Sequence, residues 1–278
     1  MRKLSTKSIQ ITKISGQKSA VASDFAAIEE PLEISITLKS AQPEICNKNI
    51  SITMRTPGAD KDLALGFLFT EGIINSFSQI ENVIQSTNNI NIQLKNSSAL
   101  DLSKLERHFY TSSSCGVCGK SSIVAIKTVR QIKVDITTFT VPKATIYSLP
   151  LKLREQQKVF ETTGGLHAAA LFNQNGNLSI LREDVGRHNA LDKLIGAALQ
   201  ENTIPLSNQL LLLSGRISFE LVQKAAMAGI QFIMAIGAPS SLAIELAKEF
   251  NITLIGFLNT ERFNIYTGEE KVENRTFE

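Results

Sequence analysis

The strongest constraint on the fold is a regular alternation of apolar runs and amphipathic segments toward the end of the chain. Apolar runs at 210–213, 232–236 and 252–257 have the length of buried strands, and helical patterns at 219–228 and 242–250 separate them. This β-α-β-α-β order is typical of parallel strands whose crossover helices cover the sheet. The sequence therefore predicts an α/β fold for this part of the chain.

Earlier segments carry weaker but readable patterns. Segments in which apolar and polar residues alternate are predicted to be strands, and Pro, Gly or Asn-Gly marks the turns between them. Asp184 is a candidate N-cap for a helix. The expected strands are 31–38, 49–54, 90–94, 166–172 and 178–181, and the expected helices are 60–70, 144–160 with an interruption near Pro150, and 185–199 behind Asp184.

These patterns divide the chain into three parts. Residues 1–22 are polar and aperiodic, and we expect a flexible tail there. Residues 23–140 are expected to form a smaller α+β lobe that ends in a long irregular stretch, which in a compact chain is usually functional. Residues 141–278 are expected to form the α/β domain, with a mixed, partly parallel sheet.

The amino-acid composition limits the kinds of ligand and the cellular setting that we expect for the protein. The chain has 278 residues, 43% of them hydrophobic, and a net charge of +3, which suits an anionic ligand but is too weak to indicate nucleic acid. No apolar run is long enough to span a membrane, and no secretory signal is expected at the start. Three cysteines do not make a disulfide framework, so we expect a cytoplasmic protein.

Two of the cysteines, Cys115 and Cys118, lie three residues apart in the string Ser-Cys-Gly-Val-Cys-Gly-Lys. Small flanking residues would leave the thiols accessible, and Lys120 is a candidate cation to stabilise a thiolate. The two cysteines could form half of a zinc site, but no second cysteine pair exists and histidines are few, so no resident metal is expected. They could also be a redox-active pair, or two loop cysteines without a function, and both interpretations remain possible.

Three further groups of residues could bind an anion. His167 follows Gly164-Gly165, where the backbone can approach a ligand closely, although a histidine at a strand start is often merely hydrogen-bonded. Arg187 and His188 lie at a strand-to-helix junction, where helix N–H groups and a guanidinium favour phosphate. A capping aspartate within a solvated charge cluster would explain the same pattern.

The third group comprises the turns after two predicted parallel strands. Ser214 and Arg216 lie in the first turn, and residues 237–241 form the second. Neither is a phosphate-binding loop of the GxxxxGK[ST] kind, but ligands of open α/β sheets bind at these strand ends. The sequence therefore predicts an anion or nucleotide crevice. A zinc deaminase is disfavoured because Ala168 and Ala169 follow His167, leaving no His-x-Glu.

Together these strings resemble the FdhD family of formate dehydrogenase accessory proteins. The resemblance covers nearly the whole chain beyond its first residues, and the strings that carry it are 29–32, 54–58, 63–67, 71–74, 114–120, 163–170, 183–193, 214–220, 222–225, 238–243 and 263–267.

The resemblance implies a sulfurtransferase. A cysteine desulfurase would load sulfur as a persulfide on Cys115, and the protein would pass it to the molybdenum bis(molybdopterin guanine dinucleotide) cofactor destined for formate dehydrogenase. Cys118 matches the second loop cysteine. The resemblance also implies a cytidine-deaminase-like fold for the α/β domain and a homodimer.

The family's cofactor-contacting stretch falls on Phe257, Leu258, Asn259, Thr260, Glu261 and Arg262. A guanine nucleotide such as GDP is expected to occupy the same site. Many members have glycine where this chain has Glu261, and an added carboxylate beside a phosphate is electrostatically unfavourable.

Two other functions remain alternatives. A binding chaperone that only protects the cofactor would depend on Arg187 and Arg262 rather than on the cysteines. A thiol-disulfide oxidoreductase would depend equally on Cys115 and Cys118.

Overall fold

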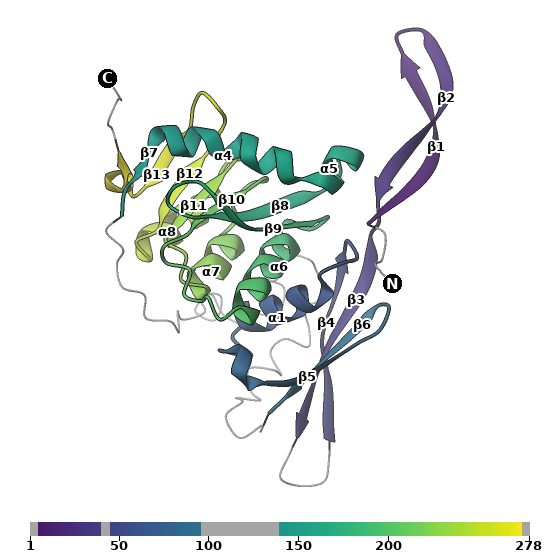
Figure 1. Cartoon of the computed structure of the whole chain (residues 1–278), viewed down its shortest axis with the longest axis vertical. Helices are drawn as coiled ribbons and strands as arrows, with labels where there is room; N and C mark the ends of the chain where they lie inside the picture. Colours follow the sequence, from purple (N-terminus) through teal and green to yellow (C-terminus); the bar gives the residue numbers. More distant parts are fainter. Residues whose placement is uncertain (1–4, 40–44, 96–138, 274–278) are drawn as a thin grey trace.

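The computed structural model describes residues 5–39, 45–95 and 139–273 (Figure 1). Its largest sheet has six strands in the order β13-β12-β11-β10-β8-β9. Strands β10, β11 and β12 run parallel, whereas β8, β9 and β13 pair antiparallel with their neighbours. The bounds are β8 His167–Phe172, β9 Leu178–Asp184, β10 Leu210–Leu213, β11 Phe232–Ala235, β12 Thr253–Gly256 and β13 Asn264–Thr267. The predicted α/β fold with a mixed, partly parallel sheet is confirmed.

Side chains of this sheet alternate between two apolar layers, as strand geometry requires. On β10, Leu211 and Leu213 belong to the larger hydrophobic cluster, whereas Leu210 and Leu212 belong to the smaller one. Because both faces are covered, these strands are apolar throughout, which is why their sequences read as unbroken hydrophobic runs.

Helices cover both faces of the sheet (Figure 1). The helices α6 (Arg187–Gln200), α7 (Phe219–Met227) and α8 (Ser241–Glu249) supply the larger cluster, and α4 (Lys143–Gln156) supplies the smaller one. None of the helices in the described ranges is long and apolar enough to cross a membrane.

The predicted helix over 144–160 breaks at a different place from the one expected. Pro150 lies inside α4, and the break comes at Gln157, after which α5 (Lys158–Thr163) begins. The side chain of Glu183 explains the new start, since its carboxylate accepts hydrogen bonds from the backbone N–H groups of Val159 (3.2 Å) and Phe160 (2.9 Å).

Asp184 does not cap a helix that starts at Val185, as the sequence had indicated. Strand β9 continues through Asp184, so α6 begins only at Arg187, with Gly186 as its N-cap. The buried carboxylate instead accepts hydrogen bonds from the backbone N–H groups of Gly186 (2.8 Å) and Thr56 (3.1 Å) and pairs with Lys193 at 2.7 Å.

A second, four-stranded sheet belongs to the N-terminal half. Its order is β4-β3-β6-β5, and helix α1 (Asp60–Thr70) has the bounds that the sequence predicts. The strands are β3 Glu30–Lys39, β4 Ile45–Arg55, β5 Ile80–Gln85 and β6 Asn89–Leu94, and a short parallel pair elsewhere joins β7 Val141–Pro142 to β14 Val272–Glu273.

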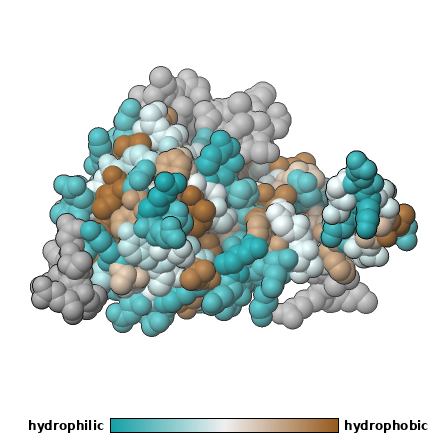
Figure 2. Space-filling model, turned by 90° about the horizontal axis from the view of Figure 1, so that it is seen from above, coloured by the Kyte–Doolittle hydropathy of each residue, from teal (hydrophilic) through white to brown (hydrophobic). Residues whose placement is uncertain are grey.

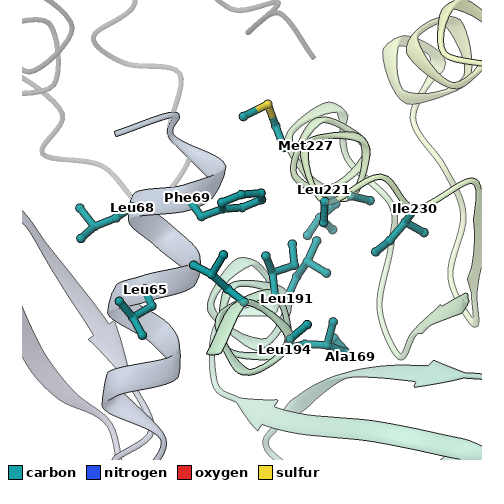
Figure 3. Packing of buried hydrophobic residues seen from close by; sticks show 14 of the residues in the cluster. Leu65, Leu68, Phe69, Ala169, Leu191, Leu194, Leu221, Met227 and Ile230 are labelled. Carbon is teal, nitrogen blue, oxygen red and sulfur yellow. The ribbon is translucent and has the colours of Figure 1, made fainter. Parts of the chain in front are cut away.

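The two halves share one core. Figure 3 shows Leu65 and Phe69 of α1 beside Leu191 and Leu194 of α6, with Leu221 of α7 nearby, and all five belong to the larger cluster. The division at residues 140/141 therefore separates two sheets but not two independent cores; as a domain boundary it stays a prediction.

The N-terminal residues are not the expected flexible tail, so far as the structure describes them. Strands β1 (Thr6–Ser15) and β2 (Lys18–Ala27) pair along their whole length and form a ribbon that projects from the body (Figure 1). Most of the ribbon's side chains are exposed, so no burial imposes an alternating pattern on its sequence.

On the face of the molecule seen in Figure 2, apolar side chains are scattered among hydrophilic ones rather than gathered in one patch.

Candidate functional site

The predicted binding residues meet at one edge of the six-stranded sheet. The parallel strands β10, β11 and β12 all end there, and β8 begins there because it runs antiparallel to β10. The pairing of β8 with β9 places His167 opposite Asp184, two residues before Gly186, the N-cap of α6. Residues far apart in sequence are thus brought together where open α/β sheets bind ligands.

Hydrogen bonds tie the turns at this edge to one another. The Ser214 hydroxyl accepts a hydrogen bond from the Ala168 N–H at 2.8 Å, the Gly237 N–H donates to Gly215 O at 3.1 Å, and the Phe257 N–H donates to Gly237 O at 3.1 Å. A Cβ on Gly237 would lie 2.9 Å from Arg216 N, so the turns pack too closely for a side chain there. Ser214, Arg216 and Phe257 are therefore neighbours on a rigid rim.

His167 lies at the centre of this edge. Its ring packs against Gly215, where an added Cβ would lie 3.1 Å from His167 Nδ1. Burial lowers the pKa of His167, and the positive charge of Arg187 lowers it further, while Asp184 opposes the shift. The imidazole is therefore held neutral at physiological pH, with one nitrogen as donor and the other as acceptor.

Two buried side-chain donors in the described part of the chain lack a hydrogen-bond partner, and both belong to this region. One is Nε2 of Gln157, a residue only 5% exposed, and the other is Nε of Arg187. Buried polar atoms in proteins are nearly always satisfied, so an unmet donor needs a specific explanation. Both nitrogens are also closed off from solvent, so the unmet hydrogen bonds mark tight packing behind this edge rather than a surface open to a ligand.

A cavity of about 510 Å³ opens beside His167, between the α4–α5 segment and the sheet. This volume is in the range of small-molecule sites. Its lining combines apolar side chains with a few polar groups: Pro150, Leu153, Arg154, Gln157, Phe160, Gly164, Gly165, Leu166, His167, Ser214 and Ile236. Of the predicted site residues, it includes His167 and Ser214.

The predicted cofactor-contacting stretch, residues 257–262, forms a compact turn after β12. Asn259 organises it, since its side-chain oxygen accepts hydrogen bonds from the N–H groups of Glu261 (2.8 Å) and Arg262 (2.9 Å). Thr260, Glu261 and Arg262 are exposed. Leu258 is fully buried in the smaller cluster, so its side chain serves the core.

His188 is directed toward α7. Its Nε2 lies 3.2 Å from the Ser218 hydroxyl and 3.8 Å from the Glu220 carboxylate. The nearby His188 ring lowers the pKa of Glu220 to about 2, with Ser218 contributing in the same direction. The His188 ring therefore braces the start of α7 against the start of α6, whereas His167 faces the cavity.

The sequence analysis missed Gln157, Arg154 and Phe160. Nothing in the sequence marks them, because they line a cavity only through the break between α4 and α5. Cys115 and Cys118, the predicted catalytic pair, lie outside the described residues. Within the described ranges no cluster of three metal-binding side chains occurs.

Comparison with known proteins assigns the family. The model of the FdhD/NarQ family matches residues 27–273. The chain belongs to this family. Among its FdhD relatives, the sulfur carrier protein FdhD of Streptomyces avermitilis is 45% identical over 263 residues, which cover 91% of this chain and 90% of the relative. The protein of the same name from Sulfurisphaera tokodaii is 43% identical, with 97% and 100% covered.

A solved structure shows the same fold. The crystal structure of a proposed formate dehydrogenase accessory protein from Desulfotalea psychrophila aligns with a TM-score of 0.75 at 24% identity, covering 97% of this chain and all of the other. The sequence relatives of this FdhD family member therefore match nearly the whole chain, and the solved structure matches its architecture.

Proposed function

We propose that this protein is a sulfur carrier that delivers sulfur to the molybdenum cofactor of formate dehydrogenase. A cysteine desulfurase is the proposed donor and Cys115 the proposed carrier. The relatives that support this role are named sulfur carrier proteins and match nearly the whole chain. The proposed setting is the cytoplasm, with the chain as a homodimer and its α/β half cytidine-deaminase-like.

The proposed chemistry is sulfur transfer between thiols. The Cys115 thiolate attacks the outer sulfur of the donor's persulfide, a new S–S bond forms, and the donor's cysteine leaves as a thiolate. An electron pair of the acceptor would then form a bond to the outer sulfur on Cys115, which would break the S–S bond and return Cys115 as a thiolate. Lys120 would stabilise the thiolate, and Cys118, three residues after Cys115, is the second thiol of the same string.

The site geometry supports a large anionic acceptor such as the bis(molybdopterin guanine dinucleotide) cofactor. The observation that carries this is the cavity beside His167, which opens at the carboxyl ends of the parallel strands. Arg187 at the start of α6 and Arg216 on the exposed rim offer positive charge to phosphates, and helix N–H groups add to it. GDP is a simple probe for the same site.

Replacing Cys115 tests the carrier role. Incubation with a cysteine desulfurase and cysteine should add one sulfur atom to the wild-type protein by mass spectrometry. Cys115→Ala should abolish that addition and the restoration of formate dehydrogenase activity, while GDP binding and Tm stay unchanged. The third cysteine, Cys46, lies outside the Cys-Gly-Val-Cys string, so Cys46→Ala is the matched control and should behave as wild type in every assay. Full restoration by Cys115→Ala would reject the carrier role.

A cofactor-binding chaperone is the second candidate, and the same charged edge favours it. In that case Cys115→Ala would be mild and Arg187→Gln severe. A thiol-disulfide oxidoreductase would instead show equal dependence on Cys115 and Cys118 and would reduce generic disulfides.

A further inference from the structure

We propose that Thr56 and Asn189 are positioning residues for the ligand-binding edge, because together they fix the segment between β9 and α6 that presents Arg187. The inference rests on the proposed function, since that edge is where the anionic acceptor is proposed to bind. It assigns a role in ligand binding to two residues that do not line the cavity. Thr56 lies in the N-terminal half of the chain, in the 56–59 connection that joins β4 to α1.

Two residues, Val185 and Gly186, link β9 to α6, and side chains take up their N–H groups. The Val185 N–H donates to the Thr56 hydroxyl at 3.2 Å, and the Gly186 N–H donates to the Asp184 carboxylate at 2.8 Å. Backbone N–H groups that are shielded from water need an acceptor, so these two hydrogen bonds determine the path of the chain from the strand into the helix. One of the two acceptors comes from the other half of the protein.

The fully buried carboxylate of Asp184 is the centre of this arrangement. One of its oxygens accepts from the Gly186 N–H and from the Asn189 amide at 3.1 Å, and the other accepts from the Thr56 N–H at 3.1 Å and pairs with Lys193 at 2.7 Å. Lys193 also donates to Thr56 O at 2.8 Å. Thr56 therefore bonds to the start of α6 and the end of β9 through its N–H, its hydroxyl and its carbonyl oxygen.

Asn189 makes a second tie between the same segments. Its amide nitrogen donates to Met54 O at 2.8 Å, and its amide oxygen accepts from the Thr53 hydroxyl at 3.2 Å. A Cβ added to Gly186 would lie 3.1 Å from Asn189 Nδ2, so the amide packs directly against the linking segment. Asn189 lies in the first turn of α6, two residues after Arg187, and its ties to β4 therefore set the orientation of that turn.

The 56–59 connection is itself held rigidly. Arg55 and Asp60, the residues on either side of it, form a buried bidentate pair with nitrogen–oxygen distances of 2.9 and 3.0 Å. The Gly58 N–H donates to the same carboxylate at 3.3 Å. A guanidinium–carboxylate pair of this kind fixes orientation as well as distance. Thr56 is thus held against the start of α6 by a rigid support rather than by a loose loop.

Arg187 connects this arrangement to the ligand-binding edge. Its positive charge lowers the pKa of His167, which lines the cavity, so the two side chains are close to each other. The contact between a guanidinium and a phosphate depends on orientation, because two parallel N–H groups must meet two oxygens. A shift of the first turn of α6 therefore weakens the binding of an anion without changing any residue that contacts it.

Calorimetry with GDP on the full chain tests the role of Asn189. Asn189→Ala removes the amide that ties α6 to β4, and we expect it to weaken GDP binding about tenfold, the equivalent of one lost hydrogen bond to the ligand. Asn91→Ala is the matched control. The Asn91 amide also bridges segments, donating to Ser35 at 2.9 Å and to Asn47 at 3.2 Å, but it lies in β6, which does not line the cavity. Its GDP affinity should stay within about twofold of wild type.

Threonine variants separate positioning from stability. Thr56→Val removes the acceptor of the Val185 N–H and should weaken GDP binding about tenfold, whereas Thr56→Ser keeps the hydroxyl and should restore the affinity. Thr70→Val is the control, because Thr70 is also 3% exposed and hydrogen-bonds to Asp192 at 2.9 Å, but does not line the cavity. Thr70→Val should lower Tm and leave GDP affinity unchanged. Should Thr56→Val not fold, the half-buried Asn189 provides the decisive variant.

The positioning role would be overturned by wild-type GDP affinity in Asn189→Ala or in folded Thr56→Val, or by equal losses in Asn189→Ala and Asn91→Ala. Absence of GDP binding by the wild type would overturn it together with the anionic acceptor. Sulfur loading of Cys115 needs no acceptor, so it should be unchanged in Asn189→Ala, and its loss would show a general disturbance of the fold instead of positioning. Failure of this inference is therefore distinguishable from failure of the sulfur carrier role, which Cys115→Ala decides.

Discussion

At the scale of single residues, the ionisable groups around the sheet edge have fixed neighbours. Asp184 is buried against Lys193, His167 is held neutral, and Glu220 is held ionised by His188 and Ser218. These assignments separate two histidines that the sequence treats alike. His167 is free to face a ligand, whereas His188 is occupied in holding the start of α7.

The stability that Glu220 contributes depends on pH. Its pKa in the folded protein, about 2, lies below the ordinary 4.5, so its contribution to stability is fully present above pH 4.5 and is lost as the pH falls toward 2. We expect Glu220→Gln to lower the stability at pH 6, and the gap from wild type to narrow steadily down to pH 3. Urea unfolding at several pH values measures the difference in the free energy of unfolding between the two proteins.

His188→Gln serves as the companion variant, because it removes the group that shifts Glu220 most. It should lose the same pH-dependent part of the stability. A gap between wild type and Glu220→Gln that stays constant from pH 6 to pH 3 would contradict the assignment.

At the scale of elements, α1 and α6 cross with backbone against backbone. A Cβ on Gly66 would lie 1.8 Å from the carbonyl oxygen of Asp192, and one on Gly196 would lie 1.8 Å from that of Asp62. The two glycines let the helices approach closely enough for Leu65 and Leu191 to pack in one core (Figure 3). Glycine weakens each isolated helix, so the close crossing is what makes it favourable here.

Gly66→Ala should therefore destabilise the protein by about 3 kcal/mol or more, because neither backbone can move away without disturbing the core. Chemical denaturation measures the change. Gly165→Ala is the control: the nearest atom to its added Cβ is 3.8 Å away, and the expected change is within about 0.5 kcal/mol. Similar effects of the two substitutions would refute the role of the crossing.

At the scale of the whole molecule, a buried polar network joins the two halves. Lys224 of α7 donates hydrogen bonds to Asp192 of α6 (2.9 and 3.0 Å) and to Thr70 of α1 (2.8 Å). Burial alone would lower the pKa of Lys224, but Asp192 and Glu71 raise it above its ordinary value, so the ammonium stays charged. Three helices from both halves therefore depend on one ion pair.

Asp192→Ala leaves that ammonium buried without its main partner, and we expect it to cost about 3–5 kcal/mol and to lower Tm accordingly. The double variant Asp192→Leu, Lys224→Met removes both charges and should recover most of the loss. Thermal and urea unfolding of the three proteins measure it. A double variant as unstable as the single one would show that packing, rather than the unpaired charge, dominates the loss.

The α/β alternation, the bounds of α1 and the family could be predicted from the sequence, because buried strands and amphipathic helices leave periodic patterns and the motifs 114–120, 163–170 and 183–193 are specific. Other features depend on contacts between residues far apart in the chain. The sequence of the β1–β2 ribbon has no apolar periodicity that would predict its strands. Asp184 accepts a hydrogen bond from the backbone of Thr56, which is far away in sequence, and pairs with Lys193 inside α6. The unmet donor of Gln157 arises from a helix break that Glu183 fixes from another strand, and no local pattern encodes a contact of that kind.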